Sequence, residues 1–292
     1  MKIERNVRCI LFDLGSTLWT SKDERVIQVH ERIANLRAVL ELFRFNGTGI
    51  YSEMDVDDLG RLMRKNFEKQ IRLKTRQLVE YEPDFAQATM EALQNIGIPD
   101  VTREPGEVIY EALRVRTPDI RVLFEDTLAT LAALKERGYL LGVVSNRHYG
   151  GAPFSEDLRE MGLLDYIELR HMAISADLGI RKPNPDIFLH ALNSLDVSPE
   201  EAVMVGDSLR GDITGANRLK ILSIWMPKTS LRADALAAMR ASGQAQQDGL
   251  TDDYLLAYTR QIEKRGRQTP DDVRPDLIIE RLSDLLNLFQ GV

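Results

Sequence analysis

The chain has 292 residues, of which 43% are hydrophobic and 28% are charged, and its net charge is −7. This length predicts about two domains with sizeable cores. The acidic balance speaks against a surface for nucleic acid or acidic membranes, because no excess of basic residues is present to neutralise phosphates. The single cysteine, Cys9, excludes an intramolecular disulfide and a cysteine-rich metal site, and we expect it to be a small buried hydrophobe.

The N-terminal segment MKIERNVRCILFD lacks the long apolar stretch and small-residue cleavage site of a secretory signal. Nowhere does an apolar run approach about 18 residues, the length at which a membrane-spanning helix becomes a candidate. We therefore expect a cytoplasmic protein with no membrane span and no nucleic-acid partner. The sequence does not define its oligomeric state.

Short apolar runs alternate with helical patterns along much of the chain, which predicts an α/β fold with a doubly wound parallel sheet. The predicted strands lie at residues 7–13, 139–145, 168–174, 202–207, 221–226 and 275–279. The helical patterns between them lie at residues 126–137, 153–161, 185–195 and 213–218.

Residues 20–117 break this alternation, because they show helical spacing and almost no strand pattern. Met63, Phe67 and Ile71, for example, recur every three to four residues. We expect a separate helical domain here, inserted after the first strand and lying over the ends of the sheet strands. The predicted domains are an α/β core of residues 1–19 and 118–292, and a helical domain of residues 20–117.

A further insertion is predicted at residues 228–273, before the last strand. It contains Ala-rich and Gln-rich helical stretches, ADALAAMRA and YLLAYTRQIEK. We interpret it as a tolerated surface insertion, and a surface helical hairpin or an oligomer contact are the alternatives.

Four motifs place acidic and polar residues where predicted strands end or a helix begins. They are FDLGST with Asp13, VVSN with Ser145, RKPNPDIF with Lys182, and GDSLRGD with Asp207 and Asp212. In a doubly wound sheet, ligands bind at the carboxyl ends of the strands. Because Asp13, Ser145 and Asp207 each close a predicted strand, we expect the four motifs to meet at one edge of the sheet.

These residue types in this order are typical of a phosphoryl-transfer site. Asp13 is the expected nucleophile, which would attack phosphorus and form an aspartyl phosphate. A hard cation would let the two anions approach, and Mg²⁺ prefers oxygen ligands such as Asp13, Asp207 and Asp212. Lys182, the Ser145 hydroxyl and backbone N–H groups would hold the equatorial oxygens of the transition state.

The combination resembles the haloacid dehalogenase-like superfamily of hydrolases, which are mostly Mg²⁺-dependent phosphatases. The resemblance covers residues 7–18 and 121–226, and the closing PDLIIERLSDLL is also similar to that family's last strand and helix. It implies that residues 20–117 are the family's helical cap, which closes over the crevice, excludes water and selects the substrate.

The resemblance also implies a role for each motif. Asp13 matches the nucleophile, Ser145 the second-motif phosphate binder, and Lys182 the third-motif lysine. Asp207 and Asp212 match the acidic fourth motif. The family's metal also takes a backbone carbonyl two residues after the nucleophile. Gly15 can supply that carbonyl, and Leu14, Gly15 and Asn146 complete the predicted phosphate-binding set.

The match breaks at Gly15, because phosphatases of this family carry a second Asp two positions after the nucleophile. In the family that Asp protonates the leaving group and then activates water, and the usual Gly after it is Ser16 here. A positioned acid–base group contributes roughly 10²–10⁴-fold to the rate. We therefore expect ordinary alkyl phosphate monoesters to be poor substrates, whereas acyl or enol phosphates would need less protonation.

Another side chain could replace the missing acid, and His148, His30 and Asp23 are the candidates. A histidine on a surface is more often a polar residue without such a role. The family's dehalogenases also lack this Asp but do not need the metal, so the retention of Asp207 and Asp212 makes dehalogenation a poor fit.

Two further interpretations stay open. The family's phosphonatase branch is similar in having a small residue at this position, and it uses a cap lysine to form a Schiff base; Lys22, Lys65, Lys69 and Lys74 are candidates. Alternatively, the chain is a non-catalytic module that binds a phosphorylated ligand and Mg²⁺. We favour a Mg²⁺-dependent hydrolase that acts on a small phosphorylated molecule.

Overall fold

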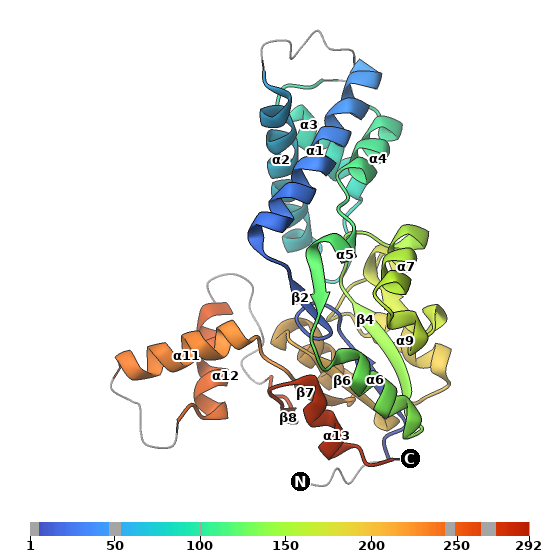
Figure 1. The fold of residues 1–292 in the computed structure, drawn as a ribbon, viewed down its shortest axis with the longest axis vertical. Helices are drawn as coiled ribbons and strands as arrows, with labels where there is room; N and C mark the ends of the chain where they lie inside the picture. Colours follow the sequence, from blue (N-terminus) through green and yellow to red (C-terminus); the bar gives the residue numbers. More distant parts are fainter. Residues whose placement is uncertain (1–5, 47–53, 100, 243–248, 264–272, 292) are drawn as a thin grey trace. The chain divides into compact units, whose positions relative to one another are not determined.

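The computed structural model describes residues 6–46, 54–99, 101–242, 249–263 and 273–291 (Figure 1). The chain divides into two compact units. The α/β unit comprises Met1–Thr20, Leu123–Arg147 and Met161–Val292, and the helical unit comprises Ser21–Val122 and His148–Glu160.

Six parallel strands form the sheet of the α/β unit, and all six lie within the predicted ranges (Figure 1). Their order is β5-β4-β1-β6-β7-β8, and every neighbouring pair is parallel. The order reverses at β1, which confirms the doubly wound fold and places the switch point beside this strand. The strands are β1 (Cys9–Phe12), β4 (Leu140–Ser145), β5 (Met172–Ile174), β6 (Ala202–Gly206), β7 (Leu222–Trp225) and β8 (Leu277–Ile278).

Three predicted helices of this unit are present as α6 (Thr127–Glu136), α9 (Pro185–Leu195) and α10 (Thr214–Arg218). α9 begins where predicted because the Asn184 side chain accepts a hydrogen bond from the Asp186 amide and Pro185 occupies the first turn. The remaining short elements are α8 (Ser175–Leu178), α13 (Leu285–Leu288), 3₁₀ turns at Leu163–Asp165, Leu169–His171, Pro199–Glu201 and Leu282–Asp284, and a π-helical turn at Leu209–Ile213.

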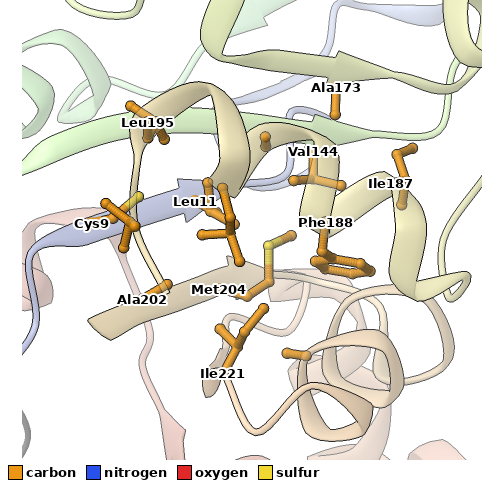
Figure 2. Packing of buried hydrophobic residues seen from close by; sticks show 14 residues of the cluster. Cys9, Leu11, Val144, Ala173, Ile187, Phe188, Leu195, Ala202, Met204 and Ile221 are labelled. Atoms are coloured by element: carbon orange, nitrogen blue, oxygen red, sulfur yellow. The ribbon is translucent and has the colours of Figure 1, made fainter. Parts of the chain in front are cut away.

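A core of buried apolar side chains packs α9 against the central strands (Figure 2). Leu11 from β1, Met204 from β6 and Phe188 from α9 have no exposed surface and belong to one cluster. Cys9 lies in the same cluster, and burial raises the pKa of its thiol to about 12, so it is a buried hydrophobe as expected. This packing fixes β1, which carries Asp13 at its end.

The helical unit has its own apolar core. Met63, Phe67 and Ile71 are buried on one face of α2, as their spacing predicts, and they pack with Leu42 and Leu93 from the neighbouring helices. The elements of this unit are α1 (Glu24–Asn46), α2 (Val56–Gln77), α3 (Phe85–Gln94), α4 (Arg103–Ala112), α5 (Thr117–Ile120) and α7 (Gly151–Glu160).

The boundary between the units differs from the predicted one, because α7 belongs to the helical unit rather than to the α/β core. The buried carboxylate of Asp157 on α7 pairs with Arg114 and Arg116 and accepts a hydrogen bond from the Thr117 amide at 2.9 Å. These partners are distant in sequence, so periodicity alone gave no sign of them. Two short strands that the sequence did not predict, β2 (Trp19–Ser21) and β3 (Arg121–Leu123), pair where the chain passes between the units.

Two helices, α11 (Thr229–Ala241) and α12 (Asp252–Glu263), lie in the second predicted insertion, whose residues 243–248 and 264–272 fall outside the described residues. The pair packs on the α/β unit, because Ala235 and Leu255 bury themselves against Leu209, Ile213 and Trp225. The insertion is therefore continuous with the core near β6 and β7. Within the described ranges, no helix has the length and apolar character needed to cross a membrane.

Candidate active site

The carboxyl ends of three adjacent strands carry Asp13, Ser145 and Asp207. Asp13 directly follows β1, Ser145 is the last residue of β4, and Asp207 directly follows β6. Because β4 and β6 flank β1 in the sheet, the three side chains meet at one edge, as the motifs predict. The Asp13 amide donates to the Val205 carbonyl at 2.9 Å, which anchors the start of the turn to β6.

Lys182 is the centre of the site's hydrogen bonding. Its side chain is 3% exposed, and its ammonium lies 2.7 Å from Asp13 Oδ1, 2.6 Å from Asp212 Oδ1 and 2.6 Å from the Val144 carbonyl oxygen. Burial lowers the pKa of this lysine, but the charges of Asp13 and Asp212 outweigh burial and hold the pKa above its usual value. Lys182 is therefore a permanent cation between two carboxylates.

Asn146 holds the backbone of Lys182. Its side-chain oxygen accepts from the Lys182 amide at 2.8 Å, and its side-chain nitrogen donates to the Lys182 carbonyl at 3.1 Å. Both polar atoms of the Asn146 side chain therefore form hydrogen bonds with the backbone of Lys182. The predicted phosphate binder Asn146 acts in this structure by positioning the lysine.

The two oxygens of Asp13 have different surroundings. Oδ1 accepts hydrogen bonds from the Ser145 hydroxyl at 3.1 Å and from Lys182. Oδ2 lies on the side of Gly15, where an added Cβ would be 3.9 Å away. Leu14 is fully buried, and its carbonyl accepts from the Leu18 amide at 2.9 Å, so this tight turn fixes the direction in which Asp13 points.

Asp212 is held by the π-helical turn Leu209–Ile213. The Ser208 amide donates to Asp212 Oδ2 at 2.9 Å. A Cβ at Gly206 would lie 2.2 Å from this same oxygen, so the glycine at the end of β6 allows the carboxylate to approach. The side chain is 1% exposed.

Asp13, Asp207 and Asp212 form a cluster with the geometry of a metal site, since their nearest carboxylate oxygens lie within 4.8 Å of one another. Burial and the nearby carboxylates raise the pKa of Asp207 to about 7. Burial, opposed by Lys182 and reinforced by Asp13, raises the pKa of Asp212 to about 6. Asp212 Oδ1 has the Lys182 ammonium as its ion-pair partner at 2.6 Å.

This donor set fits a hard divalent cation. All the side-chain ligands are oxygens, and the excess negative charge that raises these pKa values is what a bound dication would offset. The Gly15 carbonyl, two residues after Asp13, is the predicted backbone ligand. Mg²⁺ suits such a set because it combines one or two carboxylates with other oxygen ligands.

Gly15 is not required by backbone geometry. Its φ lies outside the left-handed region, and the nearest atom to an added Cβ is Asp13 Oδ2 at an ordinary 3.9 Å. The next residue, Ser16, does adopt the left-handed conformation, with φ of 61°. The turn therefore has space for a side chain at residue 15, and the missing carboxylate is a chemical difference that packing does not impose.

The three candidate replacements for the missing acid all belong to the helical unit. Asp23 Oδ1 accepts from the Arg25 amide at 2.8 Å at the start of α1. His30 Nδ1 lies 3.5 Å from Asp119 Oδ2. The exposed His148 packs its ring against Phe85, with 5.6 Å between ring centroids. Each has a contact within its own unit, and none of these contacts indicates an acid–base role.

The candidate Schiff-base lysines also lie in the helical unit. Lys22 donates to the Pro118 carbonyl at 2.7 Å, and Lys74 donates to Glu91 at 2.8 Å. Lys65 and Lys69 are exposed on α2. No buried, desolvated lysine occurs among these four, so the feature that would mark an amine for such chemistry is missing from them.

Sequence reasoning missed Lys228 and Trp225. The Lys228 ammonium lies 3.3 Å from Asp207 Oδ2, and the Trp225 indole N–H donates to the Asp207 carbonyl at 2.8 Å. A signal was present, because both residues lie at the carboxyl end of the predicted strand 221–226, where the other site residues also gather. Lys228 is the first residue of the predicted insertion 228–273, and nothing in the sequence indicated its contact with Asp207.

The comparisons with known proteins agree with this geometry. The model of the haloacid dehalogenase-like hydrolase family matches residues 7–220. A glyceraldehyde 3-phosphate phosphatase of Pyrococcus furiosus is 30% identical over 76% of this chain and 81% of its own length. A phosphoserine phosphatase of Thermus thermophilus is 35% identical over 47% of this chain and 52% of its own length.

Solved structures share the fold. A HAD phosphatase from Thermococcus onnurineus superposes with a TM-score of 0.52 at 22% identity, over 96% of this chain and 97% of that chain. The HAD-hydrolase YfnB from Bacillus subtilis, solved bound to magnesium, superposes with a TM-score of 0.53 at 16% identity, over 97% and 98%. At these identities the likeness establishes the fold alone.

Proposed function

The chain belongs to the haloacid dehalogenase-like hydrolases, and on that premise we propose that it is a Mg²⁺-dependent phosphatase that acts on a small phosphorylated metabolite through an aspartyl phosphate at Asp13. The observation that carries this proposal is the buried pair of Asp13 and Lys182, set beside the carboxylates of Asp207 and Asp212.

In the first step, Asp13 Oδ2 attacks phosphorus while the bond from phosphorus to the leaving oxygen breaks. Oδ1 is engaged by Ser145 and Lys182, so Oδ2 is the oxygen available for attack. Lys182 and the Ser145 hydroxyl hold the phosphoryl oxygens. Bound at the carboxylate cluster, Mg²⁺ would supply positive charge against the phosphoryl oxygens.

The leaving oxygen departs with the bonding electron pair and must obtain a proton. Gly15 offers none, so the proton comes from water, which favours leaving groups that are stable as anions. In the second step, water attacks the phosphorus of the aspartyl phosphate, the bond from phosphorus to Asp13 breaks, and inorganic phosphate and the Asp13 carboxylate are released.

The names of the relatives support a substrate class. The relatives named above act on glyceraldehyde 3-phosphate and phosphoserine, which are small phosphorylated metabolites. We propose the same class for this chain, without choosing one of these compounds. We also propose that the helical unit, inserted after β1, acts as a cap that excludes water from the reaction.

One observation favours a second candidate function, a non-catalytic module that binds a phosphorylated ligand. Gly15 removes the group that normally turns over the intermediate, although the backbone there has space for a side chain. Such a module would be stabilised by its ligand and would release no phosphate. Repeated turnover on any phosphorylated compound contradicts it.

The test is phosphate release from phosphorylated compounds graded by the acidity of the leaving group, with Mg²⁺ and with a chelator. We expect metal-dependent turnover that is reduced roughly 10⁴-fold or more in Asp13→Asn, because no nucleophile replaces the carboxylate. Asp165→Asn, which changes an exposed carboxylate of the same unit, is the matched control and keeps full activity. Full activity in Asp13→Asn would contradict the proposed nucleophile.

A further inference from the structure

A pocket of about 560 Å³ lies in the α/β unit beside the site just described. Ser16 and Thr20 line it from the turn after β1, and residues 124–126, 226–230 and 280–283 complete its walls. This volume is in the range of pockets that hold small molecules, roughly 300–1,000 Å³. None of the proposed catalytic or metal-binding side chains lines it, but Ser16 and Lys228, which adjoin that site, do.

Lys228 connects this pocket to the metal cluster. It lines the pocket, and its ammonium lies 3.3 Å from Asp207 Oδ2. Its side chain is 54% exposed, so the ammonium can move between Asp207 and a ligand in the pocket. On the other wall, Ser16 is only three residues after the nucleophile Asp13. The pocket thus has one wall next to the turn that carries Asp13 and another wall in contact with Asp207.

The position of Lys228 is fixed by the packing of the insertion. Met226 and Pro227 are buried, and Trp225 before them is held by its hydrogen bond to the Asp207 carbonyl. α11 begins directly after Lys228 and packs Ala235 into the cluster that contains Trp225. The packing on both sides of Lys228 therefore fixes the position of its backbone.

The wall around Lys228 favours an anion. Thr229 and Ser230 form the first turn of the 13-residue helix α11, whose N-terminus has no side-chain cap. Their amides and hydroxyls are donors beside the ammonium, and the positive end of the helix adds to it. The pocket also contains Arg281 and three acids: Asp126 accepts from the Ser283 amide at 2.8 Å, Glu280 lies 3.5 Å from Arg232, and Glu125 is exposed.

A cation at the carboxylate cluster would compete with Lys228 for Asp207. A divalent ion bound to Asp207 offsets the negative charge that holds the ammonium there. The Lys228 ammonium is then attracted less strongly to Asp207 and can pair with another anion in the adjacent pocket. In this way metal binding and ligand binding would favour each other.

We propose that this pocket receives the leaving-group portion of the substrate and that Lys228 binds a carboxylate on it. The proposal rests on the proposed function, because it needs the phosphoryl group to lie at Asp13. Lys228 is then a specificity-determining residue that selects small phosphate esters with an acidic group over uncharged ones of similar size.

The experiment measures binding in Asp13→Asn protein with Mg²⁺, so that no ester is turned over. Isothermal titration calorimetry compares 2-phosphoglycolate, ethyl phosphate and phosphoethanolamine, which differ mainly in the charge of the leaving group. We expect 2-phosphoglycolate to bind most tightly. Adding Lys228→Met should weaken its binding about tenfold, as for loss of a charge-assisted hydrogen bond, and leave ethyl phosphate within about twofold.

Two further variants and the alternative outcomes complete the test. Lys228→Arg should restore most of the affinity for 2-phosphoglycolate, and Lys135→Met, which removes an exposed cation elsewhere in the unit, should change nothing. If Lys228→Met weakens all three esters equally, or none of them, the subsite is contradicted while the phosphatase proposal stands. If none of the three binds, the subsite is contradicted, and phosphate release by the wild-type protein from the graded compounds decides the proposed function separately.

Discussion

The two units of this chain differ in how their charged side chains are balanced by charges of opposite sign. In the helical unit, the partly exposed Lys74 pairs with Glu91, and the buried carboxylate of Asp157 is matched by the cations of Arg114 and Arg116. At the sheet edge of the α/β unit, three carboxylates face one buried lysine.

The difference indicates which unit holds the chemistry. Paired surface charges contribute little beyond solubility and are screened by salt. A buried excess of negative charge is unfavourable by itself, and the raised pKa values of Asp207 and Asp212 reflect this. Such an arrangement points to a ligand of opposite charge, and it is a mark of functional sites.

Matched lysine substitutions in the two units give the largest expected difference in stability. Lys182→Met leaves Asp13 and Asp212 buried without their cation, so the free energy of unfolding should fall by about 3–5 kcal/mol. Lys74→Met breaks a partly exposed pair and should cost less than about 1 kcal/mol. Chemical denaturation followed by tryptophan fluorescence measures both. Equal costs would mean that the buried network does not hold the site together.

The same contrast explains what the sequence predicted and what it did not. The six strands were predictable because each is a short apolar run, and Asp13, Ser145 and Asp207 follow from parallel strands ending at one edge. The place of α7 in the helical unit was not predictable, because it depends on a contact between Asp157 and Arg114, which are about forty residues apart in the sequence. Periodicity reports which face of an element is apolar, and it does not report which element that face meets.

The candidate site shows the same limit at the level of single residues. Lys182 was predicted from its motif, whereas the two hydrogen bonds by which the Asn146 side chain holds the Lys182 backbone were not predicted. Lys228 was read as part of a surface insertion, because its contact with Asp207 depends on how β7 and α11 pack. Roles that arise from one residue's own chemistry were predictable, and those that arise from tertiary contacts were not.

Mg²⁺ should stabilise the α/β unit and leave charge pairs of the helical unit unaffected. At a metal concentration of about 100 times the dissociation constant, the expected gain is about 2.7 kcal/mol. Asp212→Asn should remove most of this gain, because it takes one carboxylate from the cluster, and Asp165→Asn should keep it. Thermal unfolding with and without metal gives the answer. A wild-type midpoint that does not move with Mg²⁺ would speak against a metal site.

The smallest expected effect concerns Ser16. Its φ of 61° is a left-handed conformation that costs a non-glycine residue roughly 1–2 kcal/mol, whereas glycine loses roughly 0.5–1 kcal/mol more entropy on folding. Ser16→Gly should therefore stabilise the protein slightly, by about 0.5 kcal/mol. Denaturant titration of the two proteins side by side resolves a change of this size. A clear loss of stability would show that the Ser16 side chain contributes contacts that outweigh the strain.

We propose that this site hydrolyses phosphate esters without the usual acid at residue 15. The most direct measurement is kcat/KM against the pKa of the leaving group, for the wild type and for Gly15→Asp. There is space for the new side chain, so we expect Gly15→Asp to gain roughly 10²–10⁴-fold on alkyl phosphates and to flatten the dependence. The wild type should show a steep dependence. A flat wild-type dependence, with no gain in Gly15→Asp, would mean that another group already supplies the proton and would contradict the claim.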